Sequence, residues 1–166
     1  MAQNDIQDLL TALSAAGVRY LVVGAYALAH HGLVRATGDL DLLVEPSPAN
    51  AKRLARAIHQ FASTSLEYFG VSADELARPG VGFYMGVEPD RIDILTKISG
   101  LNFERAWRGK TKGELEGVST FVLGFDDLLA AKRASSKKRP PGSAKALQDA
   151  ADLQWLLEER ERQRGL

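Results

Sequence analysis

The chain contains no cysteine among its 166 residues. This absence excludes a disulfide framework, a thiol nucleophile and every metal site built from cysteine ligands. The composition therefore fits a reducing compartment, and we expect a cytoplasmic protein.

An excess of charge of either sign is also missing, because lysine and arginine together number 21 and aspartate and glutamate together number 21. A balanced chain has no general electrostatic attraction for a polyanion. We therefore expect no constitutive DNA binding, and any contact with nucleic acid has to be local.

Long apolar segments are absent as well. The most apolar stretch, residues 20–34, is interrupted by two glycines and two histidines and is too short to span a bilayer. Residues 1–8 contain neither the basic nor the apolar segment that is typical of a signal peptide. We therefore predict that the protein has no membrane partner.

The length favours a single domain, because 166 residues can bury one good core but are too few for two full domains. We predict one domain over residues 1–166, with a helical C-terminal part over residues 126–166. Within that part, residues 135–143 are rich in lysine, arginine, proline and glycine and form the best linker candidate. The basic run 137–139 fits a solvated loop better than an RNA-binding patch.

Apolar spacing and capping residues predict the local structure along the chain. The segment 66–69 is predicted as a short strand, and a hairpin over 81–97 turns at 88–90. Residues 144–162 are predicted as a long helix whose apolar side includes Leu147 and Leu156. The other predicted elements are helices over 6–13, 25–29, 48–61, 103–107 and 126–132, and strands over 20–23, 39–45 and 118–123.

Three aspartates stand in predicted strands, where aspartate is otherwise depleted. Asp39 and Asp41 are two residues apart, so their side chains point to the same face of one strand. Like charges this close repel and raise one another's pKa unless a cation lies between them. Asp93 stands between two isoleucines in a strand of its own and repeats the pattern.

This arrangement predicts a metal site. Carboxylate oxygens without histidine or cysteine nearby favour Mg²⁺ or Mn²⁺ over zinc, and Mg²⁺ is commonly held by carboxylates together with substrate phosphates. The alternative is that all three aspartates are solvated residues on an open face of the sheet. A lone Asp-x-Asp pair would favour that alternative, whereas three aspartates in strands favour the metal site.

Gly24 ends the strand over 20–23 abruptly, and a helix is predicted to begin directly after it. Backbone amides at a helix start, next to a glycine that permits close approach, suit a phosphate group. Taken alone, the glycine is better explained by the tight turn, and it is the aspartates that favour a phosphate site. The sequence contains neither a P-loop nor a dinucleotide-binding fingerprint that would compete with this interpretation.

Three segments carry a resemblance to a known family: Val-Val-Gly-Ala-Tyr-Ala-Leu-Ala-His-His-Gly at 22–32, Arg-Ala-Thr-Gly-Asp-Leu-Asp at 35–41, and Ile-Asp-Ile at 92–94. They resemble the Gly-Ser/Gly, Asp-x-Asp and distal Asp signature of the nucleotidyltransferase superfamily. Within it, the match looks closest to the minimal and AbiEii-like proteins. Two late segments, 127–132 and 145–153, look like the lysine helix and the Lys/Arg-x-x-x-Asp-x-x-Asp-Leu helix that close such domains.

The resemblance implies an α/β (α+β) protein with the nucleotidyltransferase (polymerase-beta-like) fold, a mixed sheet flanked by helices with further C-terminal helices. It also implies that Asp39 and Asp41 bind both metal ions and that Asp93 completes the ion that activates an acceptor hydroxyl. Paired Mg²⁺ or Mn²⁺ ions lower the pKa of the acceptor and neutralise the leaving pyrophosphate. The implied reaction transfers an NMP from an NTP substrate to a hydroxyl of a protein, an RNA or a small molecule.

Five residues are candidates for nucleotide binding: Gly24, Ala25, Arg35, Thr37 and Lys132. Ala25 departs from the family pattern, because many active members have serine or a second glycine there, so a hydroxyl contact with phosphate is missing. Arg35 would reach a triphosphate and Thr37 would cap a loop, and functional and structural roles weigh equally for both. Lys132 contacts either a nucleotide phosphate or the carbonyl groups at the end of its own helix.

Two functions of different class therefore stay open. The first is a nucleotidyltransferase, which the three retained aspartates favour. The second is a catalytically degenerate nucleotide-binding partner module, such as the antitoxin-like component of a two-gene toxin–antitoxin system. Ala25 and the lack of a recognisable acceptor domain favour this second function. A nucleoside triphosphate is the expected ligand in both cases, with a protein partner or an RNA acceptor as a further candidate.

Overall fold

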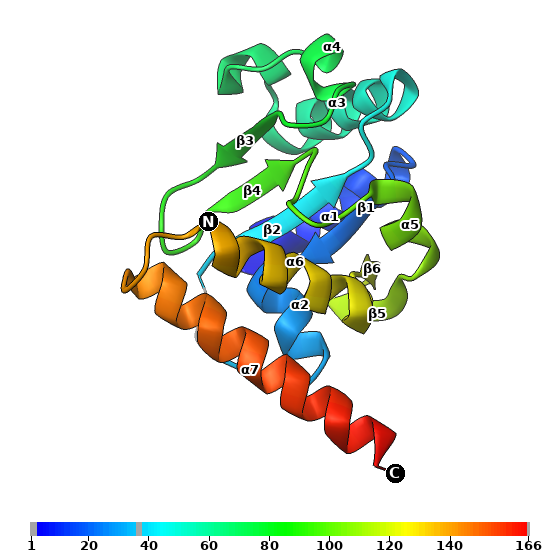
Figure 1. Ribbon diagram of the computed structural model, residues 1–166. Helices are drawn as coiled ribbons and strands as arrows, with labels where there is room; N and C mark the ends of the chain where they lie inside the picture. The colour runs from blue at the N-terminus through cyan, green and yellow to red at the C-terminus, as the bar shows by residue number, and fades with distance from the viewer. Residues whose placement is uncertain (1–2, 36–37, 166) are drawn as a thin grey trace.

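The computed structural model describes residues 3–35 and 38–165, which form a mixed six-stranded sheet with helices around it (Figure 1). The strand order is β3-β4-β2-β1-β6-β5. β2 runs parallel to β4 and β1 runs parallel to β6, while the other neighbouring strands are antiparallel. The strands are β1 (Tyr20–Val23), β2 (Leu40–Val44), β3 (Gly82–Met85), β4 (Ile92–Leu95), β5 (Thr111–Leu115) and β6 (Val118–Val122).

Helices cover both faces of this sheet. The helices are α1 (Gln3–Ala15), α2 (Gly24–His30), α3 (Pro48–Ala62), the 3₁₀ helix η1 (Leu66–Phe69), α4 (Ala73–Leu76), α5 (Phe103–Arg108), α6 (Phe125–Lys138) and α7 (Ala144–Arg164). Figure 1 shows α1 behind the sheet and α6 and α7 in front of it. In the described part of the chain, no helix is both long and apolar enough to cross a membrane.

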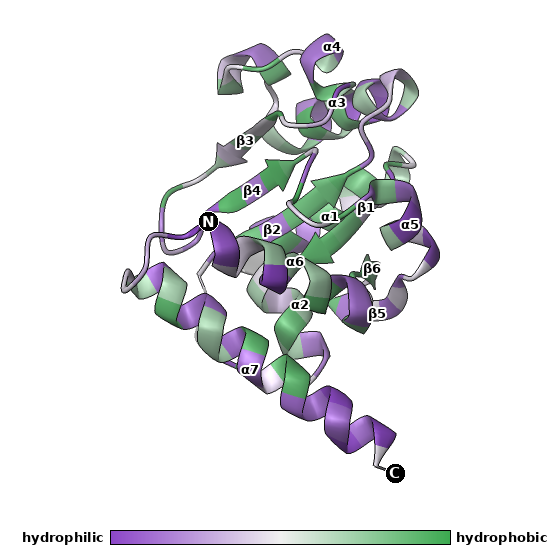
Figure 2. Ribbon diagram, viewed as in Figure 1, coloured by the Kyte–Doolittle hydropathy of each residue, from purple (hydrophilic) through white to green (hydrophobic). Residues whose placement is uncertain are grey.

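The core is built on the central strands of the sheet. All four residues of β1 are buried, and Leu40, Leu42, Ile92 and Ile94 of β2 and β4 are at most 1 % exposed. Figure 2 shows these central strands as the most hydrophobic part of the fold. Burying one such side chain contributes about 1.5–3 kcal/mol to folding. Because strand side chains alternate, the packing that buries these residues directs their strand neighbours to the opposite face.

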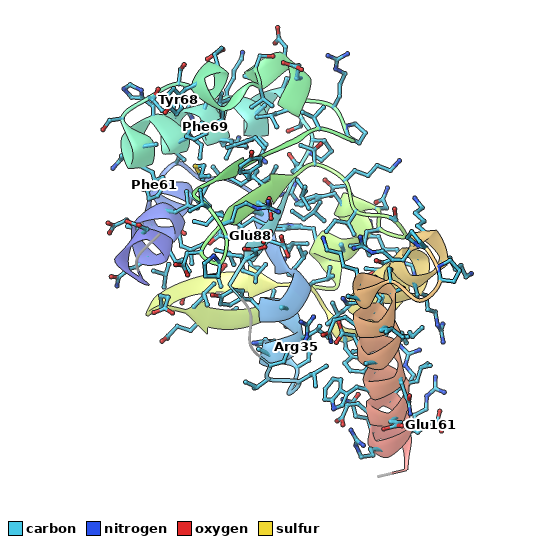
Figure 3. All side chains as sticks on the ribbon, turned by 90° about the vertical axis from the view of Figure 1, so that its left-hand side faces the viewer. Arg35, Phe61, Tyr68, Phe69, Glu88 and Glu161 are labelled. Atoms are coloured by element: carbon cyan, nitrogen blue, oxygen red, sulfur yellow. The ribbon has the colours of Figure 1, made fainter. Side chains whose placement is uncertain are left out.

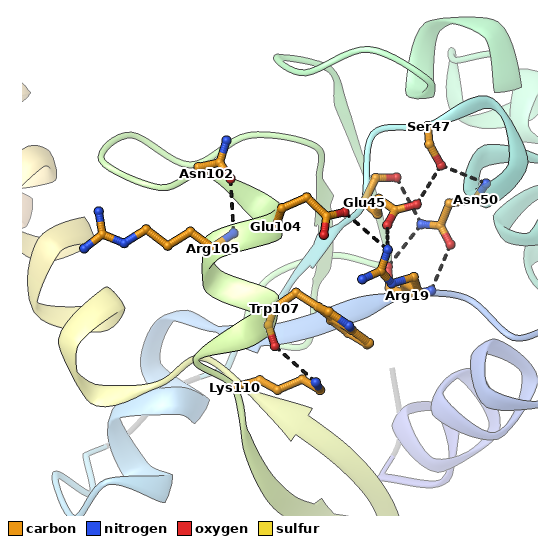
Figure 4. Close-up of polar contacts among 9 residues, drawn as sticks. All are labelled: Arg19, Glu45, Ser47, Asn50, Asn102, Glu104, Arg105, Trp107 and Lys110. Carbon is orange, nitrogen blue, oxygen red and sulfur yellow. Dashed lines mark hydrogen bonds and ion pairs between the residues drawn. The ribbon is translucent and has the colours of Figure 1, made fainter.

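The turn into α3 has the predicted cap. Ser47 Oγ accepts a hydrogen bond from the Asn50 N–H at 3.1 Å, and Pro48 is the first helical residue. The buried Asn50 side chain accepts from the Arg19 N–H at 2.8 Å and donates to the carbonyl oxygens of Arg19 and Glu45 at 3.1 and 3.0 Å (Figure 4). The Arg19 guanidinium also pairs with the Glu45 carboxylate. These contacts join the start of β1 to the end of β2.

The prediction of a strand over 66–69 is wrong, because these residues form η1. Leu66 and Phe69, three residues apart, pack against the core, while Glu67 and Tyr68 are exposed. A spacing of three fits the 3₁₀ repeat and does not fit the alternation of a strand. Figure 3 shows Tyr68 and Phe69 together at the end of the molecule away from α7.

The predicted linker over 135–143 is too long, because α6 continues to Lys138. Inside this helix Ser136 Oγ donates to the carbonyl oxygen of Lys132 at 3.2 Å. Lysines in a last helical turn are favoured by the helix dipole, which extends α6 through the basic run. Arg139 then leaves the helix in an extended conformation before Pro140, so only residues 139–143 connect α6 to α7.

The buried side of α7 differs from the prediction. Leu156 is buried as expected, but Leu147 is 64 % exposed. Asp149 and Asp152 are buried in its place. Apolar spacing does not predict this buried face of α7. Asp149 and Asp152 can be buried there because cationic side chains from other elements neutralise their charges.

Candidate active site

Asp41 on β2 and Asp93 on β4 lie side by side. They are register partners in the parallel pair β2–β4, and residues paired in this way point to the same face of the sheet. Both side chains are partly buried. The structure therefore brings these two predicted carboxylates together, and their role as metal ligands stays a prediction.

Asp41 and Asp93 are close enough for the charge of Asp93 to raise the pKa of Asp41. Burial raises the pKa of Asp41 to about 7, and the charge of Asp93, a hydrogen bond with Asp93 and the charge of Asp39 act in the same direction. Asp39 lies one residue before β2, which is why its charge reaches Asp41. A proton on Asp41 would relieve the repulsion, and a bound cation would relieve it as well.

Arg91 directly precedes β4 and contacts this pair. Its Nε lies 3.2 Å from each carboxylate oxygen of Asp93, and its Nη2 lies 3.2 Å from Oδ2. The guanidinium carbon lies 5.0 Å from the ring centroid of Tyr84, and Nη1 lies 3.6 Å from Oε1 of Glu88. Arg91 is not among the site residues predicted from the sequence, although its spacing of two from Asp93 is the same signal that links Asp39 to Asp41.

Gly24 makes the turn from β1 into α2 and touches the carboxylate of Asp41. Its φ of +66° lies in the left-handed region that favours glycine. A β-carbon at Gly24 would lie 2.4 Å from Oδ2 and 3.2 Å from Cγ of Asp41, so the turn has no room for a side chain. The tight turn and the close approach therefore both require glycine here. Ala25 follows inside α2 and is partly buried.

A cavity of about 270 Å³ opens at this turn. It is lined by Gly24 at the start of α2, by Asp41 of β2, and by Lys132 and Arg139 from the α6 side. The other lining residues are Val23, Leu95, Ile98, Leu123, Leu128, Ala131 and Ser135. A larger cavity of about 560 Å³ meets it at Ile98 but includes none of the three aspartates, so we assign the candidate site to the smaller one.

Lys132 is held by the two buried aspartates of α7. Its Nζ lies 3.2 Å from Oδ1 of Asp149 and 2.9 Å from Oδ2 of Asp152. Arg139 Nε lies 3.1 Å from Asp149 Oδ2, and Arg35 Nη2 lies 2.9 Å from Asp152 Oδ2. Figure 3 shows Arg35 on the loop that faces α7. Lys132 therefore pairs with carboxylates and not with the carbonyl groups at the end of α6.

The contacts around Asp149 favour the charged form of its carboxyl group. Burial acts to raise its pKa, but the hydrogen bond from Ser135, the charge of Lys132 and the hydrogen bonds from Arg139 and Lys132 outweigh burial and lower the pKa. The three cations Lys132, Arg35 and Arg139 face only two carboxylates. By formal charge this cluster of five side chains is therefore net positive.

The other predicted site residue, Thr37, lies outside the described residues. The structure brings Gly24, Asp41 and Lys132 to one cavity and sets Asp93 beside Asp41. Arg35 reaches this region through its contact with Asp152. Arg139 joins the cavity from the segment that the sequence assigns to a solvated loop.

The donor set fits a hard divalent cation, since Asp41 and Asp93 offer oxygen ligands that repel each other without one. Among the described residues, however, no group of three or more histidine, cysteine, aspartate or glutamate side chains is arranged as a complete metal site. The Asp93 carboxylate binds Arg91 instead. A cation would have to replace contacts that the carboxylates now make with each other and with Arg91.

Comparisons with known proteins bear on the fold. No family model matches the sequence, and no curated protein matches it. The chain is similar to the solution structure of the antibiotic-resistance factor ANT(2'')-Ia, with a TM-score of 0.51 and 12 % sequence identity. The match covers 98 % of this chain and 93 % of that chain. At this identity the likeness shows the fold alone, and it agrees with the predicted nucleotidyltransferase (polymerase-beta-like) fold.

Proposed function

We propose that this protein is a Mg²⁺-dependent nucleotidyltransferase that moves an NMP from an NTP to a hydroxyl acceptor. The observation that carries the proposal is the juxtaposition of Asp41 with Asp93 at the Gly24 turn. Fold likeness alone would not support a reaction, because one fold hosts many functions.

The carboxylates would hold the cation. Asp41, Asp93 and Asp39 would hold Mg²⁺ or Mn²⁺, which when bound neutralises the phosphates and lowers the pKa of the acceptor hydroxyl. In the proposed reaction the acceptor hydroxyl would lose its proton to solvent, its oxygen would bond to the α-phosphorus, and the bond between that phosphorus and pyrophosphate would break to release pyrophosphate. The close contact of Gly24 with Asp41 would keep the phosphates beside these carboxylates.

The cationic side of the cavity would bind the triphosphate. Lys132 and Arg139 line the cavity, and Arg35 joins them through Asp152. Because these cations are already held by Asp149 and Asp152, they are oriented before a nucleotide binds. Such orientation lowers the entropic cost of binding.

Ala25 supports a second candidate, a catalytically degenerate nucleotide-binding module, such as the antitoxin-like component of a two-gene system. Its methyl group stands where a serine would give a hydroxyl contact to phosphate. Both candidates bind a nucleoside triphosphate at the same cavity, and only the first transfers its NMP.

A label-transfer experiment distinguishes the nucleotidyltransferase from the nucleotide-binding module. The protein is incubated with α-phosphate-labelled NTPs, Mg²⁺ and a cell extract, alongside Asp41→Asn and Asp93→Asn. An enzyme labels an acceptor that both variants leave unlabelled. If the wild-type protein binds the nucleotide but labels no acceptor in the extract, the partner module is the function. Equal labelling by the wild type and both variants would contradict the proposed site.

A further inference from the structure

Arg91 has no part in the reaction proposed above, yet its guanidinium directly contacts Asp93 of the acidic pair. Its Nε contacts both carboxylate oxygens of Asp93 at 3.2 Å, and its Nη2 adds a second contact to Oδ2 at 3.2 Å. Asp93 in turn is the register partner of Asp41. One guanidinium therefore supplies positive charge where the proposed reaction requires a divalent cation.

The guanidinium and a cation cannot both hold Asp93 in this way. A divalent ion needs at least one of the two oxygens that Arg91 now contacts. Two positive charges on one partly buried carboxylate also repel strongly. Binding of one therefore opposes binding of the other.

The Arg91 guanidinium also has contacts outside the acidic pair. Its guanidinium already lies over the Tyr84 ring, 5.0 Å from the centroid, and 3.6 Å from Oε1 of Glu88. The Arg91 side chain is 31 % exposed, and Tyr84 is 59 % exposed on the edge strand β3. Figure 3 shows Glu88 on the turn between β3 and β4. The guanidinium can leave Asp93 and keep these contacts, so its displacement needs no rearrangement of the fold.

We propose that Arg91 is the resident counter-ion of the Asp41–Asp93 pair, and that a divalent cation binds there by displacing the guanidinium from Asp93 toward Tyr84 and Glu88. This inference rests on the proposed function, because it takes the pair as the cation site. Arg91 is a positioning residue in this scheme. Arg91 stabilises the two carboxylates in the metal-free protein, and a cation must bind them more favourably than the guanidinium does.

The test measures cation affinity without nucleotide. Mn²⁺ is titrated calorimetrically into the wild type, Arg91→Gln and the control Arg78→Gln, after circular dichroism shows that each is folded. Arg78 is exposed, so its replacement removes the same charge elsewhere. Because Mn²⁺ no longer breaks charge-assisted hydrogen bonds, Arg91→Gln should bind Mn²⁺ more tightly by on the order of tenfold. Arg78→Gln should match the wild type.

A spectroscopic readout follows the displacement itself. The Nε–Hε signal of Arg91, assigned by its loss in Arg91→Gln, should shift when Mg²⁺ is added to the wild type. Saturable binding that is tighter in Arg91→Gln, together with this shift, supports the proposal. Equal Mn²⁺ affinity in Arg91→Gln and the wild type overturns the inference and leaves the proposed function intact. No saturable binding in either protein overturns both.

Discussion

A β-carbon on Gly24 would lie 2.4 Å from Oδ2 of Asp41, so the turn into α2 and the acidic strand β2 are packed against each other without space for a methyl group. The two signals that the sequence offers separately, a glycine turn and an Asp-x-Asp strand, are thus one structural unit. A substitution at either residue acts on both.

Gly24→Ala should therefore lower the free energy of unfolding beyond the ordinary cost of a left-handed alanine. The added methyl must push the Asp41 carboxylate away, and overpacking of this kind costs about 1–3 kcal/mol. Gly80→Ala is the matched control, because Gly80 has a φ of +93° but a β-carbon there would meet nothing within 4 Å. Urea unfolding in the presence of a chelator measures the free energy of unfolding of both variants. Equal losses would mean that Asp41 moves freely and that the contact is not tight.

Asp41→Asn should stabilise the metal-free protein at alkaline pH. The pKa of Asp41 in the folded state is raised from 3.8 to about 7, so the folded state binds more protons than the unfolded state between these values. Wild-type stability should therefore fall as the pH rises from about 4 to 7 and stay low above that. Asparagine removes this loss, with a gain on the order of 2 kcal/mol at pH 8 that disappears near pH 4.

Thermal or urea unfolding across this pH range, in chelator, gives the measurement. Glu114→Gln, at an exposed position on β5, serves as the control that removes a negative charge far from the pair. Mg²⁺ should stabilise the wild type, and Asp41→Asn should lose that gain. Destabilisation by Asp41→Asn in chelator would instead assign this aspartate a structural role.

Asp149→Asn should give the opposite pH dependence. The pKa of Asp149 is lowered in the folded state, so its charge contributes stability above pH 3.8 that is lost as the pH falls through the folded value. Removing this carboxylate leaves Arg139 and Lys132 with fewer partners and should cost on the order of 2 kcal/mol at pH 7. The difference from the wild type should shrink in acid. A cost that is independent of pH would point to packing and not to charge.

Much of the fold could be predicted from particular residues. Tyr20–Val23 form β1 as predicted, and Ser47 with Pro48 starts α3 because both capping signals are local in sequence. The strand β5 could not be predicted in this way, because none of its residues is buried and its pairing with β6 holds it in place. The 3₁₀ helix over 66–69 resembles a strand in sequence because four apolar and polar residues carry too little periodicity to distinguish the two.

The candidate site could likewise be predicted only in part from the sequence. Strand alternation predicts that Asp41 and Asp93 project out of the apolar layer. That they lie side by side depends on the pairing of two strands that are distant in the chain. The partners of Lys132 could not be derived from spacing, because they come from the packing of α6 against α7. The same packing buries Asp149 and Asp152 on a helix side that apolar spacing assigns to leucine.

Asn50→Ala should destabilise the fold without touching the candidate site. Its buried amide makes three hydrogen bonds to the backbone of Arg19 and Glu45, and the substitution leaves these backbone groups unsatisfied. The expected loss is about 2–4 kcal/mol by urea unfolding. Ser47→Ala, which removes only the helix cap, should cost about 1 kcal/mol. Nucleotide affinity of the folded Asn50→Ala protein should equal that of the wild type.

The most direct measurement is calorimetric binding of a non-hydrolysable nucleoside triphosphate in Mg²⁺ and in excess chelator, for the wild type and for Asp93→Asn. If the Asp41–Asp93 pair and the Gly24 turn form a metal–nucleotide site, the wild type binds in Mg²⁺, loses most of its affinity in chelator, and Asp93→Asn binds weakly in both. Equal affinity of the wild type in Mg²⁺ and chelator, unchanged in Asp93→Asn, would contradict this account.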